Sequence, residues 1–197
     1  MTFINYRVTI VVLLFYCNSA ICQVRATSQN YWMAKEFSKE IALFNAKRYL
    51  FKEVLGPSPN ITKFEIVPLA AASSGELTTL LYKCDEKQKE GLVLGFYGNY
   101  WNDAGILYQG FAFKNLDKNE AFDFLNKIQS AIEANLKFMK ENPDNSNIYF
   151  TDNDIDILIS ATEYGIYNIR LFWKGFDSTW EKTAFERSKK RFEKKIH

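Results

Sequence analysis

Histidine is almost absent from this sequence, because the only one is His197, the last residue. Catalytic systems that pair a serine or cysteine nucleophile with an imidazole are therefore excluded. Zinc and iron sites built on histidine ligands are excluded for the same reason. Neither of the common glycine-rich phosphate loops occurs, so we expect no cofactor. Any catalysis would depend on carboxylates, lysine or tyrosine.

An apolar run long enough to cross a membrane is also missing near the N-terminus. The run there covers only residues 8–17, whereas about 20 apolar residues are needed to span a bilayer. Arg7 precedes the run, and the small residues Ala20 and Cys22 follow it, which is the pattern of a cleavable export signal. The sequence predicts a signal peptide over residues 1–22. We therefore expect a secreted or periplasmic protein with no transmembrane segment after signal cleavage.

Cysteine is scarce, and two of the three cysteines, Cys17 and Cys22, fall within the predicted signal. The mature chain then has Cys84 alone, so no intrachain disulfide can form and the fold must depend on its apolar core. A lone cysteine in a strand is expected to be a small buried side chain. Attachment of a lipid to Cys22 is an alternative, although the bulky Ile21 stands where lipoprotein signals have a small residue.

Net charge is low, with a formal excess of +2. Domains that bind nucleic acid neutralise several phosphates and are usually clearly basic, so nucleic acid is not expected as a partner. Apolar residues make up 47% of the chain and aromatic residues 16%, which is enough material for a core. No repeat or linker divides the sequence, so residues 23–197 are expected to form a single domain.

Hydrophobic spacing predicts an α+β fold with the element order α-ββββ-α-ββ-α. The first helix is expected over residues 32–55, four strands over 63–72, 76–84, 92–97 and 106–114, and a second helix from 117 to 142. Two strands over 155–161 and 167–173 and a C-terminal helix from residue 178 complete the order. Pro68 places the first strand at a sheet edge. The expected sheet is antiparallel, with about six strands: a four-strand meander plus a hairpin.

Capping-box spacing marks the starts of the second and third helices, at Asp117 with Glu120 and at Ser178 with Glu181. The apolar spacing of the first helix includes Phe44 and Phe51. The third helix has a thin apolar stripe and many basic residues, so we expect a solvated helix held by a few contacts. Contact of its basic side with an anionic surface is the alternative. Its apolar stripe consists of Trp180, Ala184, Phe192 and Ile196.

An acidic cluster contains Asp152, Asp154 and Asp156. Oxygen-bearing side chains at this spacing resemble the start of a calcium-binding loop, but Ile157 stands where the loop needs glycine for its sharp turn. The segment also alternates like a strand, so calcium binding by these residues is only a weak alternative. A rival hypothesis is a carboxylate-dependent hydrolase that acts on glycans. It requires Asp103 to meet this cluster in a cleft, so that their carboxylates supply the acid and base.

A short polar segment rich in aromatic residues separates the third and fourth predicted strands. Large aromatic residues near a hairpin tip are typical of recognition surfaces. The alternative is that Trp101 folds back over the sheet edge and closes the core. The predicted ligand-binding residues are Asn99, Tyr100, Trp101, Asn102 and Asp103.

Aromatic residues occupy both alternating faces of the predicted strands, so one face is expected to be a ligand groove or a self-association surface, unless helices cover both faces. The sequence therefore favours an exported, non-catalytic binding protein that recognises a partner protein or a glycan. A structural subunit of an envelope complex is a further alternative, and it predicts self-association through a sheet face.

Overall fold

A computed structural model of the chain describes residues 40–101, 104–143, 145–162 and 166–196. The chain divides into two units between Ala42 and Leu43, and the second unit contains the strands that are described. The predicted signal over residues 1–22, including Cys22, lies outside the described residues. Among the described helices, none combines the length and the apolar character needed to cross a membrane.

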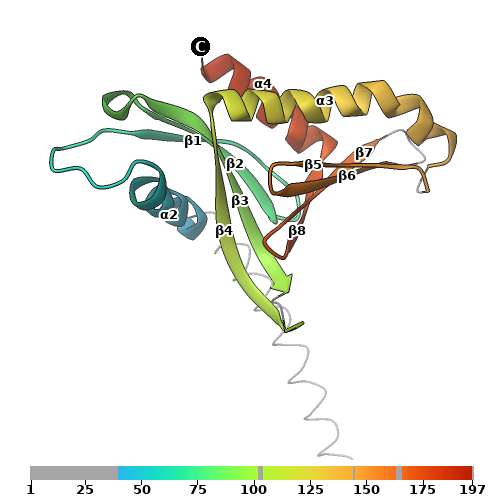
Figure 1. The fold of residues 1–197 in the computed structure, drawn as a ribbon, viewed down its shortest axis with the longest axis horizontal. Coiled ribbons are helices and arrows are strands. Elements are labelled where there is room, and N and C mark those ends of the chain that lie inside the picture. Colours follow the sequence, from blue (N-terminus) through green and yellow to red (C-terminus); the bar gives the residue numbers. More distant parts are fainter. Residues whose placement is uncertain (1–39, 102–103, 144, 163–165, 197) are drawn as a thin grey trace, which may run out of the picture. The chain divides into compact units, whose positions relative to one another are not determined.

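The described elements confirm the α+β class and follow one another as Figure 1 shows. The helical elements are α2 (Glu40–Tyr49), its π-helical continuation η1 (Leu50–Val54), the short turn η2 (Asp85–Lys87), α3 (Lys118–Glu141) and α4 (Lys182–Lys195). The strands are β1 (Glu65–Ala71), β2 (Leu77–Cys84), β3 (Lys89–Trp101), β4 (Leu107–Asp117), β5 (Asn147–Asp152), β6 (Ile155–Ala161), β7 (Tyr167–Trp173) and β8 (Phe176–Glu181). Two of these strands, β5 and β8, exceed the six that the sequence predicts.

All eight strands belong to one antiparallel sheet in which β3 joins two leaves. The order is β1-β2-β3-β8-β7-β6-β5, and β4 pairs with the other edge of β3. We call β1–β4 the first leaf and β5–β8 the second leaf. β3 pairs with β2 as far as Phe96 and meets β8 where Tyr100 pairs with Phe176. As predicted, Pro68 lies in the edge strand β1, and the register of β1 with β2 shifts between Pro68 and Ala70.

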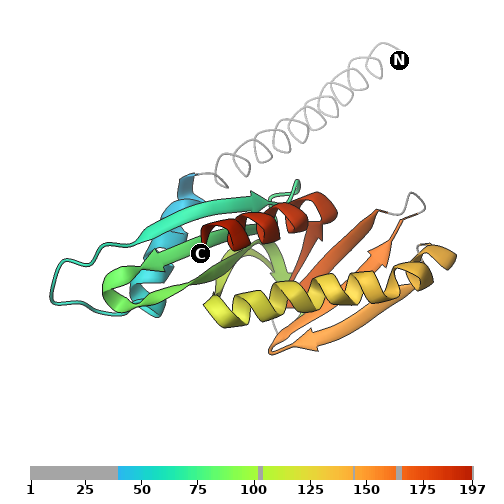
Figure 2. The same ribbon diagram turned by 90° about the horizontal axis from the view of Figure 1, so that it is seen from above.

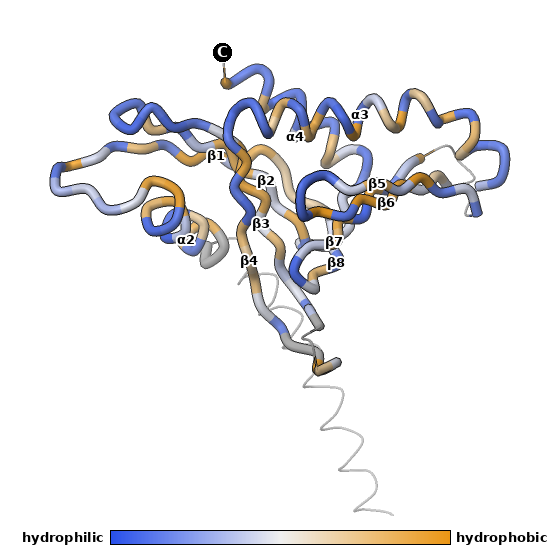
Figure 3. Tube along the Cα trace, in the orientation of Figure 1, coloured by the Kyte–Doolittle hydropathy of each residue, from blue (hydrophilic) through white to orange (hydrophobic). Residues whose placement is uncertain are grey.

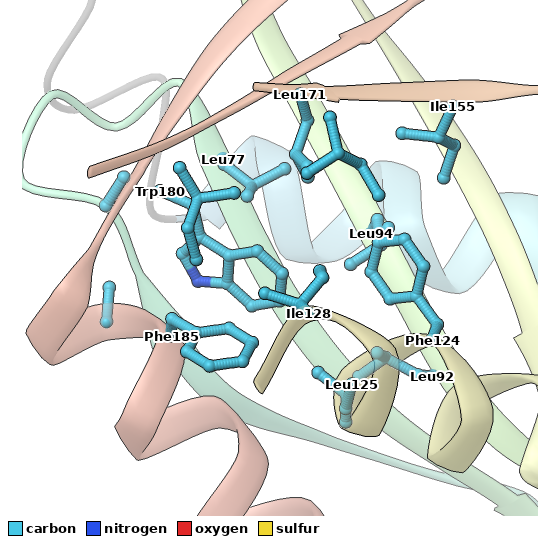
Figure 4. Close-up of a cluster of buried hydrophobic side chains, with 14 of the residues drawn as sticks. Leu77, Leu92, Leu94, Phe124, Leu125, Ile128, Ile155, Leu171, Trp180 and Phe185 are labelled. Carbon is cyan, nitrogen blue, oxygen red and sulfur yellow. The ribbon is translucent and has the colours of Figure 1, made fainter. Parts of the chain in front are cut away.

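Helices α3 and α4 cover one face of the sheet (Figures 1 and 2). The predicted capping box starts α3: the Asp117 side chain accepts a hydrogen bond from the Glu120 N–H, and the Glu120 side chain accepts one from the Asp117 N–H. Side chains of α3 then meet those of both leaves, as Figure 4 shows for Leu125, Ile128 and Trp180. Each large side chain buried here contributes about 1.5–3 kcal/mol of hydrophobic stabilisation.

The helix α2 and its continuation η1 cover the opposite face of the first leaf. Ala46, Leu50 and Val54 pack there against a separate apolar cluster of the strands. The prediction that Phe44 and Phe51 share the buried stripe is wrong, because they are 65% and 48% exposed. The small side chain of Ala46 is fully buried, so the helix approaches the sheet on that side and the two phenylalanines, seven residues apart, lie on another side of the helix.

The predicted capping box at Ser178 is also wrong. Ser178 is buried in β8 and pairs with Leu171, and α4 begins only at Lys182 without a side-chain cap. A two-residue turn joins β7 to β8, and both of its residues, Lys174 and Gly175, have positive φ. Turns of this kind connect antiparallel strands with the twist that they require. The strand therefore continues through Trp180, which the sequence assigns to the helix.

Alkaline pH is expected to destabilise the fold through Tyr82. Burial raises the pKa of Tyr82 from 10.0 to about 12, against the opposing effect of a hydrogen bond with the Asn115 side chain. A raised tyrosine pKa means that the neutral phenol is favoured in the folded state. The stabilisation is complete below pH 10 and is lost as the pH rises from 10 towards 12.

Urea unfolding of the parent and of Tyr82→Phe across this pH range tests the effect. The parent is expected to lose stability more steeply than the variant, which keeps the ring but has no proton to release. Burial also raises the pKa of three other tyrosines, so the variant should retain a weaker dependence; they are Tyr49, Tyr97 and Tyr167. Identical slopes for the two proteins would show that Tyr82 has no part in the alkaline transition.

Candidate functional site

The predicted recognition residues lie at the distal end of the β3–β4 hairpin. The hairpin continues beyond Phe96, where its pairing with β2 stops, to the pair Trp101 and Leu107. The predicted loop from Gly98 to Gly105 is therefore too long at its start, because β3 continues to Trp101, whereas β4 begins only at Leu107. Asn99 and Tyr100 are strand residues, paired with Gln109 and Tyr108 respectively. Trp101 ends β3, and Asn102 and Asp103 lie outside the described residues.

Tyr100 packs against the sheet and lies on the side that faces the main core. Its ring centroid is 5.0 Å from that of Phe176 in β8, and the side chain is half-buried. Across the hairpin the ring lies over Gly110, where an added Cβ would come within 3.0 Å of the tyrosine ring. Tyr100 thus supports the hairpin, and its contact with a ligand would involve only the exposed part of its ring.

The opposite side of the hairpin carries a row of aromatic rings. Phe111 lies 6.3 Å from Tyr97 and 5.7 Å from Phe113 between ring centroids, and Tyr49 of α2 stacks on Phe113 at 5.4 Å. Opposite Phe113 is Gly95, whose missing side chain leaves room for the rings of Phe113 and Tyr97. The row therefore runs from beneath α2 to the open end of the hairpin, where Phe111 is 43% exposed.

Amide side chains continue this side of the hairpin towards its tip. Asn99 and Gln109 pair with each other two residues beyond Tyr97 and Phe111, so the strand alternation places all four on one side. Both amides are exposed. We call Tyr97, Asn99, Gln109 and Phe111 the aromatic face. It combines exposed aromatic surface with hydrogen-bonding groups at its border.

The hairpin is almost free of charge. Asp103 is the only charged residue between Glu90 and Lys114, so the described part of the distal hairpin contains none. β4 has β3 as its only strand partner in the described part of the chain, which leaves its outer backbone edge without a neighbouring strand. Protein sheets usually protect such edges with lysine or other charges. A neutral aromatic edge is suited to contact with another molecule.

The acidic cluster is dispersed among separate partners. Lys127 donates a hydrogen bond to Asp152 at 2.6 Å, and Lys114 donates one to Asp154 at 2.6 Å. The hydrogen bond from Lys114 is also the main reason why the pKa of Asp154 is lowered. Asp156 accepts a hydrogen bond from the Thr151 hydroxyl at 2.7 Å.

The tight turn between β5 and β6 explains why polar residues gather in this segment. Asn153, with a left-handed backbone, lies in the tight connection between β5 and β6, where Asp152 pairs with Ile155. In the described residues, no three side chains of histidine, cysteine, aspartate or glutamate gather as they would around a metal ion. The structure therefore does not bring Asp152, Asp154 and Asp156 together, and Asp103, their partner in the hydrolase hypothesis, is not described.

Gln109 and Phe111 are missing from the predicted site, although the sequence contains a signal for them. Gln109, Phe111 and Phe113 alternate with Gly110 and Ala112, which indicates a strand with one large-residue side. Gly110 resembles loop punctuation when only the sequence is considered. Its contact with Tyr100 across the hairpin shows that it belongs to a paired strand.

Comparison with known proteins finds no matching family, curated protein or solved structure. The chemistry of the site must therefore come from its own residues: a preformed aromatic row, two amides and a neutral strand edge.

Proposed function

We propose that this chain is an exported, non-catalytic binding protein that recognises a partner protein or a glycan through the aromatic face of the β3–β4 hairpin. The observation that carries the proposal is the exposure of Phe111, 43%, at the end of a row of packed rings in a segment without charge. Export rests on the sequence pattern of residues 1–22.

The mechanism is burial of aromatic surface within a polar border. Removing apolar area from water contributes roughly 25 cal/mol per Å², and interfaces concentrate this energy in a few aromatic residues. Phe113 holds Phe111 and Tyr97 from the side, so their rings lose little conformational freedom on binding. Asn99 and Gln109 supply hydrogen-bond donors and acceptors, which suit either the peptide backbone of a partner protein or the hydroxyls of a sugar. Trp101, Asn102 and Asp103 follow Tyr100 in the sequence and remain part of the proposed recognition segment.

Phe111→Ala is expected to weaken binding by more than about 1 kcal/mol, a loss of at least fivefold in affinity. The test begins with capture from the native extracytoplasmic fraction and with a glycan array, using the purified chain. The affinity of the identified ligand is then measured for each variant by calorimetry. Tyr149→Ala is the matched control, because Tyr149 is 65% exposed on β5, away from the hairpin.

Loss of binding in Phe111→Ala but not in Tyr149→Ala, with both variants folded, would support the aromatic face as the contact. Equal affinity of all three proteins for the ligand would remove the aromatic face from the proposal. A glycan that the chain cleaves on the array would overturn the non-catalytic part and favour the hydrolase.

A further inference from the structure

Helix α4 carries much of the positive charge of the chain. Between Lys182 and Lys195 seven residues are basic and two are acidic, whereas the whole chain has a formal net charge of only +2. The remainder of the chain is therefore net acidic. Figure 3 shows the hydrophilic character of most of α4. This unequal distribution of charge gives α4 an electrostatic character that the rest of the chain lacks.

Some of the cations on α4 already have partners. Lys189 forms an ion pair with Glu193, and Arg191 donates a hydrogen bond to the backbone carbonyl of Leu69. Others are exposed and have no ion-pair partner in the part of the chain that the structure describes. These are Arg187, Lys190, Lys194 and Lys195, and we call the first three, which share one side of the helix, the cationic row.

The spacing of the cationic row places it opposite the buried side of the helix. Steps of three and four residues keep Arg187, Lys190 and Lys194 on one side. Phe185 and Phe192, which are fully buried against the core, lie on the other side. The helical rise separates the ends of the row by roughly 10 Å along the axis. The three cations therefore suit an extended array of anions.

We propose that the cationic row docks this chain on an anionic phospholipid surface. Figures 1 and 2 show α3 and α4 in one layer over the sheet, so the row lies on an outward-facing helix. A planar array of headgroups reaches all three cations at once, and α3 in the same layer adds no net repulsion because its four acidic residues are balanced by four lysines. A long polyanion that wraps around the molecule meets the acidic remainder of the chain and is repelled, which favours the membrane over nucleic acid or an acidic polysaccharide.

The contact is electrostatic, because the apolar residues of α4 are buried in the core and are not available for insertion into lipid. They are Ala184, Phe185 and Phe192. Binding should therefore be reversible and sensitive to salt, since the screening length falls from about 10 Å at 0.1 M to about 3 Å at 1 M. This inference is independent of the aromatic face, which lies on the β3–β4 hairpin.

Co-sedimentation with vesicles tests the proposal. One set contains phosphatidylcholine alone and the other contains equal parts of phosphatidylcholine and phosphatidylglycerol. The test variant is Arg187→Glu/Lys190→Glu/Lys194→Glu. The control is Lys47→Glu/Arg48→Glu/Lys52→Glu, which changes the net charge equally at exposed residues of α2 and η1, on the opposite face of the first leaf. The parent and the control are expected to bind the anionic vesicles. The row variant should bind them with an affinity that is lower by a factor of at least about ten.

Two further measurements keep the outcomes distinct. Thermal unfolding shows whether both triple variants remain folded, and dextran sulfate replaces the vesicles in a parallel assay. Failure of the parent to bind anionic vesicles at low salt would overturn the proposal, as would an equal loss in both triple variants. Binding of the row to dextran sulfate but not to vesicles would also overturn it and would assign the row to a soluble polyanion.

Discussion

Replacing Trp180 with alanine is expected to lower the free energy of unfolding by about 3–5 kcal/mol. The indole is 1% exposed and meets the ring of Phe185 edge to face, with centroids 5.0 Å apart. Trp180 lies at the end of β8 and Phe185 lies in the first turn of α4, so contact between the two rings stabilises the packing of the helix on the sheet. Truncation would leave a cavity that a strand paired on β7 cannot collapse to fill.

Urea unfolding monitored by circular dichroism measures this loss, and two variants calibrate it. Trp180→Phe keeps much of the aromatic volume and is expected to lose less than Trp180→Ala. Phe138→Ala removes a ring that is 50% exposed on α3 and should change stability by less than about 1 kcal/mol. A loss below 1 kcal/mol for Trp180→Ala would contradict the assignment of this residue to the core.

The start of α3 and the edge position of β1 could be predicted because their signals are local. The capping box of Asp117 and Glu120 depends on three consecutive peptide units, and the structure contains both of its hydrogen bonds. Pro68 lacks an N–H in any context, so an edge position follows from its chemistry alone. Gly56, with φ of +72°, likewise lies just beyond the helical segment, where the sequence predicts its end.

The assignment of β8 could not be made locally, because its sequence satisfies two patterns. Ser178 and Glu181 have the spacing of a capping box, but Phe176, Ser178 and Trp180 also alternate as in a strand. Pairing with β7 decides between them, and this pairing places all three side chains in the interior. The hairpin turn at Lys174 and Gly175 was a weaker signal than the capping box, because lysine is unusual at positive φ.

The candidate site shows the same division between local and long-range information. The aromatic composition of the hairpin identified the region, but the environment of Tyr100 depends on Phe176, which is distant in the sequence. Glycines at 98 and 105 resembled the limits of a loop, whereas β3 continues past Gly98 to Trp101 and only Gly105 lies in the connection. The exposed aromatic residue of the site is therefore Phe111, whereas the sequence predicts Tyr100. Periodicity alone could not decide which side of the hairpin faces the core.

Replacing Gly91 with alanine is expected to destabilise the fold by about 3 kcal/mol. A Cβ at this position would lie 2.2 Å from the carbonyl oxygen of Leu116 and 2.9 Å from the Tyr82 hydroxyl. The first of these atoms belongs to the backbone of β4 and cannot rotate away. Gly91 also pairs with Asp117, the residue that caps α3, so any displacement of β4 here would disturb the start of that helix.

Gly110→Ala is the matched control for this prediction, because it lies in the same hairpin and its added Cβ would meet only the edge of the Tyr100 ring, at 3.0 Å. The ring can move slightly, and alanine reduces the entropy of the unfolded chain, so the net change in unfolding free energy should be small. Equal losses for the two glycines would contradict a specific backbone clash at Gly91.

The double variant Gly91→Ala/Tyr82→Phe separates the two obstacles at Gly91. Removing the hydroxyl relieves the 2.9 Å contact but leaves the Leu116 carbonyl in place. If the backbone contact dominates, the double variant should recover little of the unfolding free energy lost by Gly91→Ala, relative to Tyr82→Phe alone. Nearly complete recovery would mean that β4 can move away from the new methyl group, and that the buried hydroxyl is what requires glycine at this position.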